Sequence, residues 1–173
     1  MEVKVKISEY QESDRAAFVE LMEQLMDYIV SIDDLKRTRR TPEFGESHSQ
    51  RTLQRVADTN GIIYVAEVNA ELVGTVVGII PEQSKEEQLE HVPSKCGKVL
   101  ELVVKGGYRG KGIGTMLINK LVEYFKKKDC NLSGVVVFVP NKNAHDLYSK
   151  LGYKDRSFYM VRDLQEQKRE PQK

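Results

Sequence analysis

The chain has 173 residues, of which 40% are hydrophobic and 31% are charged, and its formal net charge is +1. These values predict one globular domain with a substantial core and exclude the strongly basic balance of a bulk electrostatic nucleic-acid binder. No apolar run approaches the roughly 20 residues that span a bilayer, and the N-terminal residues lack the apolar core of a signal peptide. We therefore expect a cytoplasmic protein that binds neither nucleic acid nor membrane.

The N-terminal segment predicts a strand followed by a long helix. Val3 to Ile7 alternates apolar and lysine residues, which is the period of a half-exposed strand. Ser13 and Asp14 are residue types that begin helices. Apolar residues then recur on one helical face: Phe18, Leu21, Met22, Leu25, Met26 and Ile29.

A polar segment separates this helix from the next elements. Asp33 to Ser49 contains Pro42 and Gly45 and predicts a loop. A second helix is expected over about Ser49 to Asp58. The two β-rich runs on either side of Asn69-Ala70 then form a hairpin pattern.

The second half predicts alternating strands and helices. We expect a strand over Lys98 to Val104, a helix over Gly112 to Lys128 and a strand over Gly134 to Val139, whose unbroken apolar run is typical of a strand covered on both faces. A further helix is expected to end at Gly152, which is well placed as its C′ residue. A last strand is expected over about Tyr153 to Val161.

The expected element order is β-α-α-β-β-β-α-β-α-β, so the fold class is α/β. A hairpin-rich first half and a β-α-β crossover in the second half imply a mixed sheet with helices on both faces. No internal repeat or linker divides the sequence. We expect one domain over residues 1–165 and a polar C-terminal tail over residues 166–173.

Cysteine and histidine positions give no metal-binding pattern. Cys96 and Cys130 lie far apart with no CxxC pairing, and His48, His91 and His145 are scattered. His145 has nothing that identifies it as a ligand or a base, and we expect it at the surface. The sequence therefore predicts reduced thiols and no metal.

The sequence YRGKGIG, Tyr108 to Gly114, places glycines at alternate positions between an expected strand and an expected helix. Such turns let backbone amides approach a ligand, often a phosphate. A Walker A loop fails because Gly112 follows Lys111 where Ser or Thr is required, and Lys105 stands where the first glycine is required. A dinucleotide fingerprint is a poor match because Thr115 occupies its third glycine position.

The remaining pattern, Arg109-x-x-Gly112-x-Gly114, resembles the signature of the GNAT superfamily of acyl-CoA-dependent N-acetyltransferases. A second segment, VPNKNAHDLYSKLGY, independently resembles that family's Asn-x-x-Ala-x-x-x-Tyr-x-x-x-Gly-Phe/Tyr pattern. Its matching residues are Asn141, Ala144, Tyr148, Gly152 and Tyr153. The two matches together cover about Lys98 to Val161, and the first half agrees only in element order. The resemblance implies a GNAT-like central sheet that is mostly antiparallel.

The resemblance also implies acetyl-CoA as co-substrate. Amides at a helix N-terminus attract an anion, and side chains at positions 112 and 114 would obstruct a pyrophosphate lying on that backbone. In the family, the strand before the turn pairs with pantetheine. The implied cofactor-binding residues are Val103, Val104, Arg109, Gly110, Lys111, Gly112, Ile113, Gly114, Thr115 and Asn141. The sequence departs from the family at Gly106-Gly107, where relatives often carry proline or an acidic residue.

The family's mechanism implies Tyr148 as the acid that protonates the departing CoA thiolate, and the Val104 amide as an oxyanion donor. Glu101 is the best candidate base, acting through water. Tyr148 could instead be only a packed aromatic residue. Glu101 could lie on the solvent face of its strand or pair with a lysine, and Asn141 could serve as a helix N-cap, alone or as well.

The acceptor stays open at this stage. In the family, the first helices, their loop and the final strands wall the acceptor cleft. This loop intersperses acidic and basic residues, so the sign of the cleft is undecided: Asp33, Asp34, Lys36, Arg37, Arg39, Arg40, Glu43 and Glu46. A small amine, an antibiotic amine, a peptide N-terminus and a protein lysine all fit, and the resemblance allows a homodimer.

Two other classes of function compete with N-acetyl transfer. The first is a non-catalytic CoA-binding regulatory or sensor protein on the same fold, which would have no need of a thiolate acid such as Tyr148. The second is a nucleotide or nucleic-acid binding module that uses Arg109 and Lys111 on phosphates. The near-neutral charge and the lack of an aromatic base-stacking pattern weigh against it.

Overall fold

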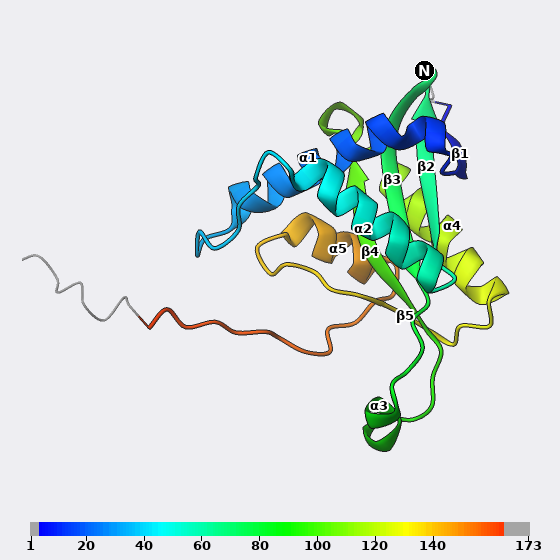
Figure 1. Ribbon diagram of the computed structural model, residues 1–173, viewed down its shortest axis with the longest axis vertical. Helices are drawn as coiled ribbons and strands as arrows, with labels where there is room; N and C mark the ends of the chain where they lie inside the picture. The colour runs from blue at the N-terminus through cyan, green and yellow to red at the C-terminus, as the bar shows by residue number, and fades with distance from the viewer. Residues whose placement is uncertain (1–3, 165–173) are drawn as a thin grey trace, which may run out of the picture.

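Five strands form one mixed sheet in the computed structural model of the protein, which describes residues 4–164 (Figure 1). The strands are β1 (Lys6–Glu9), β2 (Ile62–Val68), β3 (Glu71–Ile79), β4 (Cys96–Val104) and β5 (Leu132–Val135), in that spatial order. The pairs β1–β2, β2–β3 and β3–β4 are antiparallel, and β5 is parallel to β4. This arrangement confirms a mixed, mostly antiparallel sheet.

Helices cover both faces of the sheet. The helices are α1 (Arg15–Ile32), α2 (Phe44–Asp58), α3 (Lys85–Glu90), α4 (Ile113–Lys127) and α5 (Lys142–Lys150), with short 3-10 turns η1 (Glu12–Asp14) and η2 (Gly106–Tyr108). Successive strand residues point to opposite faces. Ile63 and Val65 therefore pack in a core with α1 and α2, whereas Tyr64 and Ala66 pack in a core with α4.

The hairpin between β2 and β3 is confirmed. Asn69 and Ala70 have φ angles of 50° and 64°, and positive φ at both central residues is the signature of the type I′ turn that suits the twist of paired strands. The hairpin brings β2 and β3 into antiparallel register, and β3 then pairs with β4.

Helix α2 begins earlier than the sequence predicts, at Phe44 rather than near Ser49. Gly45 indicates a loop from sequence, but here it is buried in the first turn of α2 against α1. A Cβ at this position would come within 2.5 Å of Glu23 Oε1. The glycine thus serves the close approach of two helices, and the loop expected over Asp33 to Ser49 is shorter.

Strand β5 ends earlier than the sequence predicts, at Val135 rather than Val139. In β4, Val99 faces Gly78 of β3 and Glu101 faces Val77, so Leu100 is an extra residue that forms a β-bulge. The pairing of β4 with β5 ends at Val99, and beyond it the two strands separate. The apolar run of residues 136–139 is therefore not covered on both faces, and Val136 is 97% exposed.

The expected last strand is absent from the described residues. Gly152 has a φ of 90° and ends α5 as predicted, with Tyr153 N donating to Tyr148 O at 3.0 Å. From there the chain leaves the body without pairing (Figure 1). Phe158 is 72% exposed, because its β-rich segment finds no neighbouring strand in the described part of the chain. The expected tail, residues 166–173, lies outside the described residues.

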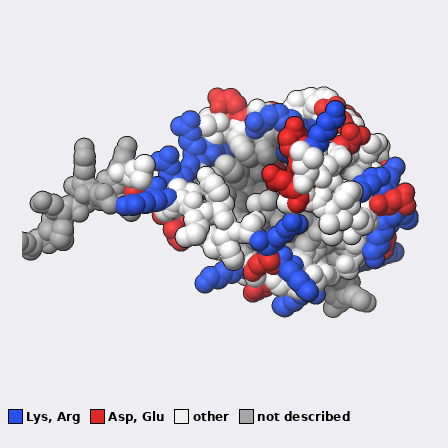
Figure 2. Space-filling model, turned by 90° about the horizontal axis from the view of Figure 1, so that it is seen from below, with Lys and Arg blue, Asp and Glu red and all other residues white. Residues whose placement is uncertain are grey.

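None of the helices within residues 4–164 is long and apolar enough to cross a membrane. Lys and Arg side chains are interspersed with Asp and Glu side chains over the face that Figure 2 shows. That distribution accords with the net charge of +1.

Candidate active site

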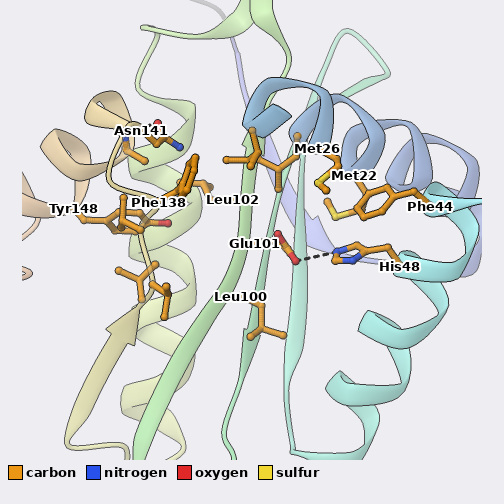
Figure 3. A pocket seen from close by; sticks show the side chains of 16 residues that line it. Met22, Met26, Phe44, His48, Leu100, Glu101, Leu102, Phe138, Asn141 and Tyr148 are labelled. Carbon is orange, nitrogen blue, oxygen red and sulfur yellow. Dashed lines mark hydrogen bonds and ion pairs between the residues drawn. The ribbon is translucent and has the colours of Figure 1, made fainter. Parts of the chain in front are cut away.

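A cavity of about 370 Å³ opens where β4 and β5 separate. One side is lined by α1 and α2, the other by residues 135–138 and by α5, and the part of β4 next to the bulge forms the floor between them (Figure 3). β-bulges often lie next to functional sites because they turn side chains out of the regular alternation. Of the site residues that the sequence predicted, Glu101, Asn141 and Tyr148 line this cavity.

The free edge of β4 runs along this cavity. Lys105 N donates to Val73 O at 2.8 Å, and this bond shows which residues of β4 direct their main-chain groups toward β3. Because paired and unpaired positions alternate in an antiparallel ladder, the main chain of Val103 faces β3. The main chains of Leu102 and Val104 face the cleft. The main chain of Val103, which the resemblance implied for coenzyme binding, thus faces away from the cleft.

The glycine turn connects η2 to α4. Gly110 and Gly112 have φ angles of 75° and 81°, and a Cβ at either would meet no protein atom within 4 Å. No side chain caps α4 at Gly112, so the first amides of the helix have no partner within it. Gly114 differs, because its Cβ would lie 3.5 Å from Leu147, in ordinary contact with α5. The first two glycines thus leave an open backbone surface.

The other residues of the turn have different surroundings. The side chain of Ile113 is buried, so Ile113 offers only its backbone to a ligand. The Lys111 ammonium lies 5.2 Å from the centre of the Tyr108 ring, a cation–π contact at the surface. Thr115 stands in the first turn of α4.

Arg109 links the turn to the cleft. Its Nε donates to Val104 O at 2.8 Å, and its guanidinium lies 5.0 Å from the centre of the Tyr28 ring. Tyr28 belongs to α1 and its hydroxyl donates to Asn141 Oδ1 at 3.4 Å. Sequence reasoning missed Tyr28, because its contacts lie 81 and 113 positions along the chain and no local spacing signals them.

Asn141 and Tyr148 project from the two ends of α5. Asn141 Oδ1 accepts from Ala144 N at 3.2 Å, so the residue is an N-cap as well as a partner of Tyr28. Tyr148 is 6% exposed and packs edge-to-face on Tyr153 at 5.3 Å. Burial, with smaller effects of Tyr153 and the Glu101 charge, raises the pKa of Tyr148. The phenol therefore stays protonated at neutral pH, with its hydroxyl directed into the cavity (Figure 3).

Glu101 also lines the cavity, on the side nearer α2. Its Oε1 lies 2.9 Å from Nε2 of His48, within hydrogen-bonding distance (Figure 3). The His48 ring stacks on Phe44 with centroids 4.8 Å apart. Sequence reasoning missed His48, although its spacing of four from Phe44 would have signalled a shared helix face if α2 had been predicted to begin earlier.

The charged loop between α1 and α2 does not line the cavity. Asp33 is buried and accepts from three backbone amides between residues 35 and 38, so it organises the loop. Glu46 pairs with Arg15 at 3.2 Å, and Arg40 pairs with Asp27. Asp33, Arg40 and Glu46 are thus engaged elsewhere, and none of the charged residues that left the sign of the cleft undecided lines the cavity.

His145, Cys96 and Cys130, to which the sequence assigned no role, lie outside the cavity. His145 is exposed and its Nε2 lies 2.8 Å from Asp155 Oδ1. Cys96 and Cys130 are free thiols, and desolvation raises the pKa of both. Within residues 4–164 no group of three or more His, Cys, Asp or Glu side chains is arranged to hold a metal ion.

The class of protein follows from this architecture and from comparison with known proteins. A sheet that opens between β4 and β5, with a glycine turn after β4, is the arrangement expected of an acyltransferase of the GNAT type. A sequence model of the Acetyltransferase (GNAT) family matches residues 29–153. The chain belongs to the GNAT acetyltransferase family.

Individual relatives agree with the family. An uncharacterized N-acetyltransferase of Methanocaldococcus jannaschii is 37% identical over 93 residues, which cover 54% of this chain and 39% of the relative. A thialysine N-epsilon-acetyltransferase of Bos taurus is 42% identical over 55 residues, 32% of each chain. The matched part is thus less than two thirds of either relative's length.

Solved structures share the fold. The crystal structure of a predicted acetyltransferase with acetyl-CoA from Clostridium acetobutylicum has a TM-score of 0.69 and 14% identity, over 93% of this chain and 97% of that one. The structural likeness therefore extends to the N-terminal half, where the sequence motifs agree only in element order.

Proposed function

We propose that the protein transfers the acetyl group of acetyl-CoA to a primary amine. The observation that carries this proposal is the pairing of Tyr148 and Glu101 across one cavity, beside a free strand edge that ends at an anion-binding turn. Membership of a family of acetyltransferases supports it. A protein that only bound CoA would need neither a phenol nor a carboxylate at the reacting end of the cleft.

The turn and the strand edge supply the coenzyme site. The unpartnered amides between residues 110 and 115 are suited to the pyrophosphate, which the positive end of α4 would attract. The main chains of Leu102 and Val104 would pair with the amides of pantetheine as a neighbouring strand would. Because the Val104 carbonyl accepts from Arg109, the Val104 amide is the group that stays available to a ligand.

Glu101 and Tyr148 supply the proton transfers. Glu101 would take a proton from the acceptor ammonium through water, since a protonated amine has no lone pair for attack. The freed lone pair forms a bond to the thioester carbon, and the carbonyl oxygen takes the negative charge of the tetrahedral intermediate. When the carbon–sulfur bond breaks, the electron pair leaves on sulfur and Tyr148 donates its proton to that thiolate. The products are an N-acetylated amine and free CoA.

A thiol-release assay tests this function. The protein is incubated with acetyl-CoA and a panel of primary amines, free thiol is measured over time, and acetylated amine is identified by mass spectrometry. We expect thiol release that depends on an amine and yields its acetylated form in equal amount. Tight binding of acetyl-CoA without acetylation of any amine would contradict the proposal and favour the non-catalytic CoA-binding alternative.

A further inference from the structure

We propose that the acceptor is a primary amine carried on a neutral, apolar body, with no carboxylate or phosphate close to the amine. This inference rests on the proposed function and specifies its substrate class. It follows from the wall of the cavity opposite Tyr148, which the coenzyme motifs do not involve.

The acceptor side of the cavity is apolar. Met22 and Met26 of α1 and Phe44 of α2 lie together on this wall, facing the interior (Figure 3). Two thioethers and an aromatic ring make an adaptable surface that favours an alkyl or aryl group. Leu100, the bulged residue of β4, adds a further apolar side chain. A sugar or a polyhydroxylated body would lose its hydrogen bonds to water on this wall.

A single carboxylate faces this apolar wall. Glu101 engages one oxygen with His48 and keeps the other for an ammonium group. The described residues that line the cavity include no other acidic side chain. One ammonium group is therefore complementary to the site, whereas a second ammonium of a polyamine would lie desolvated against Met26 or Phe44 without a partner.

The same lining offers no partner to an anion. None of the described residues around the cavity is a lysine or an arginine. Arg109 is engaged with the Val104 carbonyl and the Tyr28 ring, and Arg40 pairs with Asp27. A carboxylate or phosphate next to the acceptor amine would lose its hydration and face the negative charge of Glu101. Amino acids with a free carboxylate and amino-sugar phosphates are thus disfavoured.

The size of the cavity limits the apolar body. Its volume of about 370 Å³ lies at the low end of the usual range for ligand sites, about 300–1,000 Å³, and the acetyl end of the coenzyme takes part of it. A body the size of one large apolar side chain fits this space. Two sources offer that chemistry: a free arylalkylamine, or the N-terminal residue of a peptide, whose carboxyl group is a neutral amide.

Calorimetric binding to the CoA-saturated protein tests the inference apart from turnover. The probes are phenethylamine, phenylalanine, which adds a carboxylate to the same body, phenylalanine amide, which neutralises it, and spermidine. We expect phenethylamine to bind about tenfold or more tightly than phenylalanine and spermidine. Tighter binding of the amide than of phenethylamine would assign the acceptor to peptide N-termini. Equal or tighter binding of phenylalanine or spermidine would overturn the inference, even if thiol release confirmed acetyl transfer.

A positive charge introduced into the apolar wall tests whether the lack of a cation there disfavours an amine that carries a carboxylate. Met26→Arg supplies the missing cation. It should shift the ratio of the affinities for phenethylamine and phenylalanine about tenfold toward phenylalanine. Met160→Arg is the matched control, because Met160 is 88% exposed and does not line the cavity, and it should leave the ratio unchanged. A Met26→Arg protein that keeps its CoA affinity but shows no shift in the ratio would overturn the inference.

Discussion

Tyr148 combines a buried ring with a hydroxyl that faces the reacting end of the cleft. Burial and the nearby Glu101 charge hold its pKa above the ordinary tyrosine value, so the proton needed by the departing thiolate is in place throughout the physiological pH range. The packing against Tyr153 fixes the ring and with it the position of the hydroxyl. The residue therefore has both the proton and the rigidity that a general acid requires.

Replacing Tyr148 by phenylalanine should lower kcat about a hundredfold or more, because the thiolate would then leave without a positioned proton donor. The affinity for acetyl-CoA should change little, since the ring still packs on Tyr153. Steady-state thiol release and calorimetry measure the two quantities. Tyr153→Phe is the matched control, because the Tyr153 hydroxyl meets Ser133 outside the cavity. Unchanged kcat in Tyr148→Phe would remove Tyr148 from the acid role.

Glu101→Gln should lower turnover at neutral pH about a hundredfold, because the amide cannot take the proton of the acceptor ammonium. The deficit should shrink as the pH rises toward the acceptor's own pKa, where the amine is already neutral. Thiol release measured across pH tests both points. Glu67→Gln serves as control, since Glu67 lies on β2 and pairs with Lys6. A deficit that stays constant across pH would argue for a purely structural Glu101.

At the scale of elements, a substitution in the turn before α4 has two distinguishable effects, one on backbone conformation and one on ligand binding. Gly112→Ala places a side chain at a φ of 81° and should cost roughly 1–2 kcal/mol in unfolding free energy. It should also weaken acetyl-CoA binding strongly, because the added Cβ projects toward the ligand side, where it meets no protein atom. Chemical denaturation and calorimetry distinguish the two effects.

Gly107→Ala is the control for that variant. Gly107 is also open to solvent, but its φ is not positive and it lies before the turn. Both its stability and its acetyl-CoA affinity should stay near those of the unaltered protein. Equal losses of affinity in Gly107→Ala and Gly112→Ala would contradict a specific pyrophosphate site at the turn.

The loop between α1 and α2 depends on Asp33. The Thr38 hydroxyl, aided by backbone amides of the loop, holds the pKa of Asp33 below its ordinary value. A carboxyl whose pKa is lowered on folding stabilises the fold above its unfolded pKa, about 3.9, and loses that contribution as the pH falls through the folded pKa. Asp33→Asn should therefore lower the Tm near pH 7, and the difference should shrink below about pH 4. A difference that does not depend on pH would contradict this assignment.

Sequence patterns predicted the elements whose apolar residues face a core. The sequence predicted three features correctly because each depends only on residues close together in the chain. They are the apolar period of α1, the Asn69-Ala70 turn and the αL glycine after α5. The start of α2 was wrong because Gly45 serves helix packing, which only the fold reveals. The predictions of the length of β5 and of a last strand were wrong because apolar content indicates burial. Residues 136–138 instead line a cavity, and residues 157–161 pair with no strand among the described residues.

At the scale of the whole molecule, the two halves of the cleft differ in how well the sequence predicts them. The open glycine turn before α4 was predictable, because an anion-binding turn requires glycines at a fixed place between a strand and a helix, and that requirement is local in sequence. In the acceptor half the sequence predicted Glu101 but not its partner His48, because His48 comes from a separate element that only the fold brings to β4. The sign of the cleft stayed undecided from sequence for the same reason.

Thermal denaturation with added ligands tests most directly whether this cleft is an acetyl-CoA site. Saturation at a hundred times the Kd should stabilise the protein by about 2.7 kcal/mol, a rise in Tm of roughly 5–10 °C for a chain of this size. We predict this rise with acetyl-CoA and with CoA, and a much smaller one with ATP at the same concentration. A rise with ATP and none with either CoA species would contradict the account.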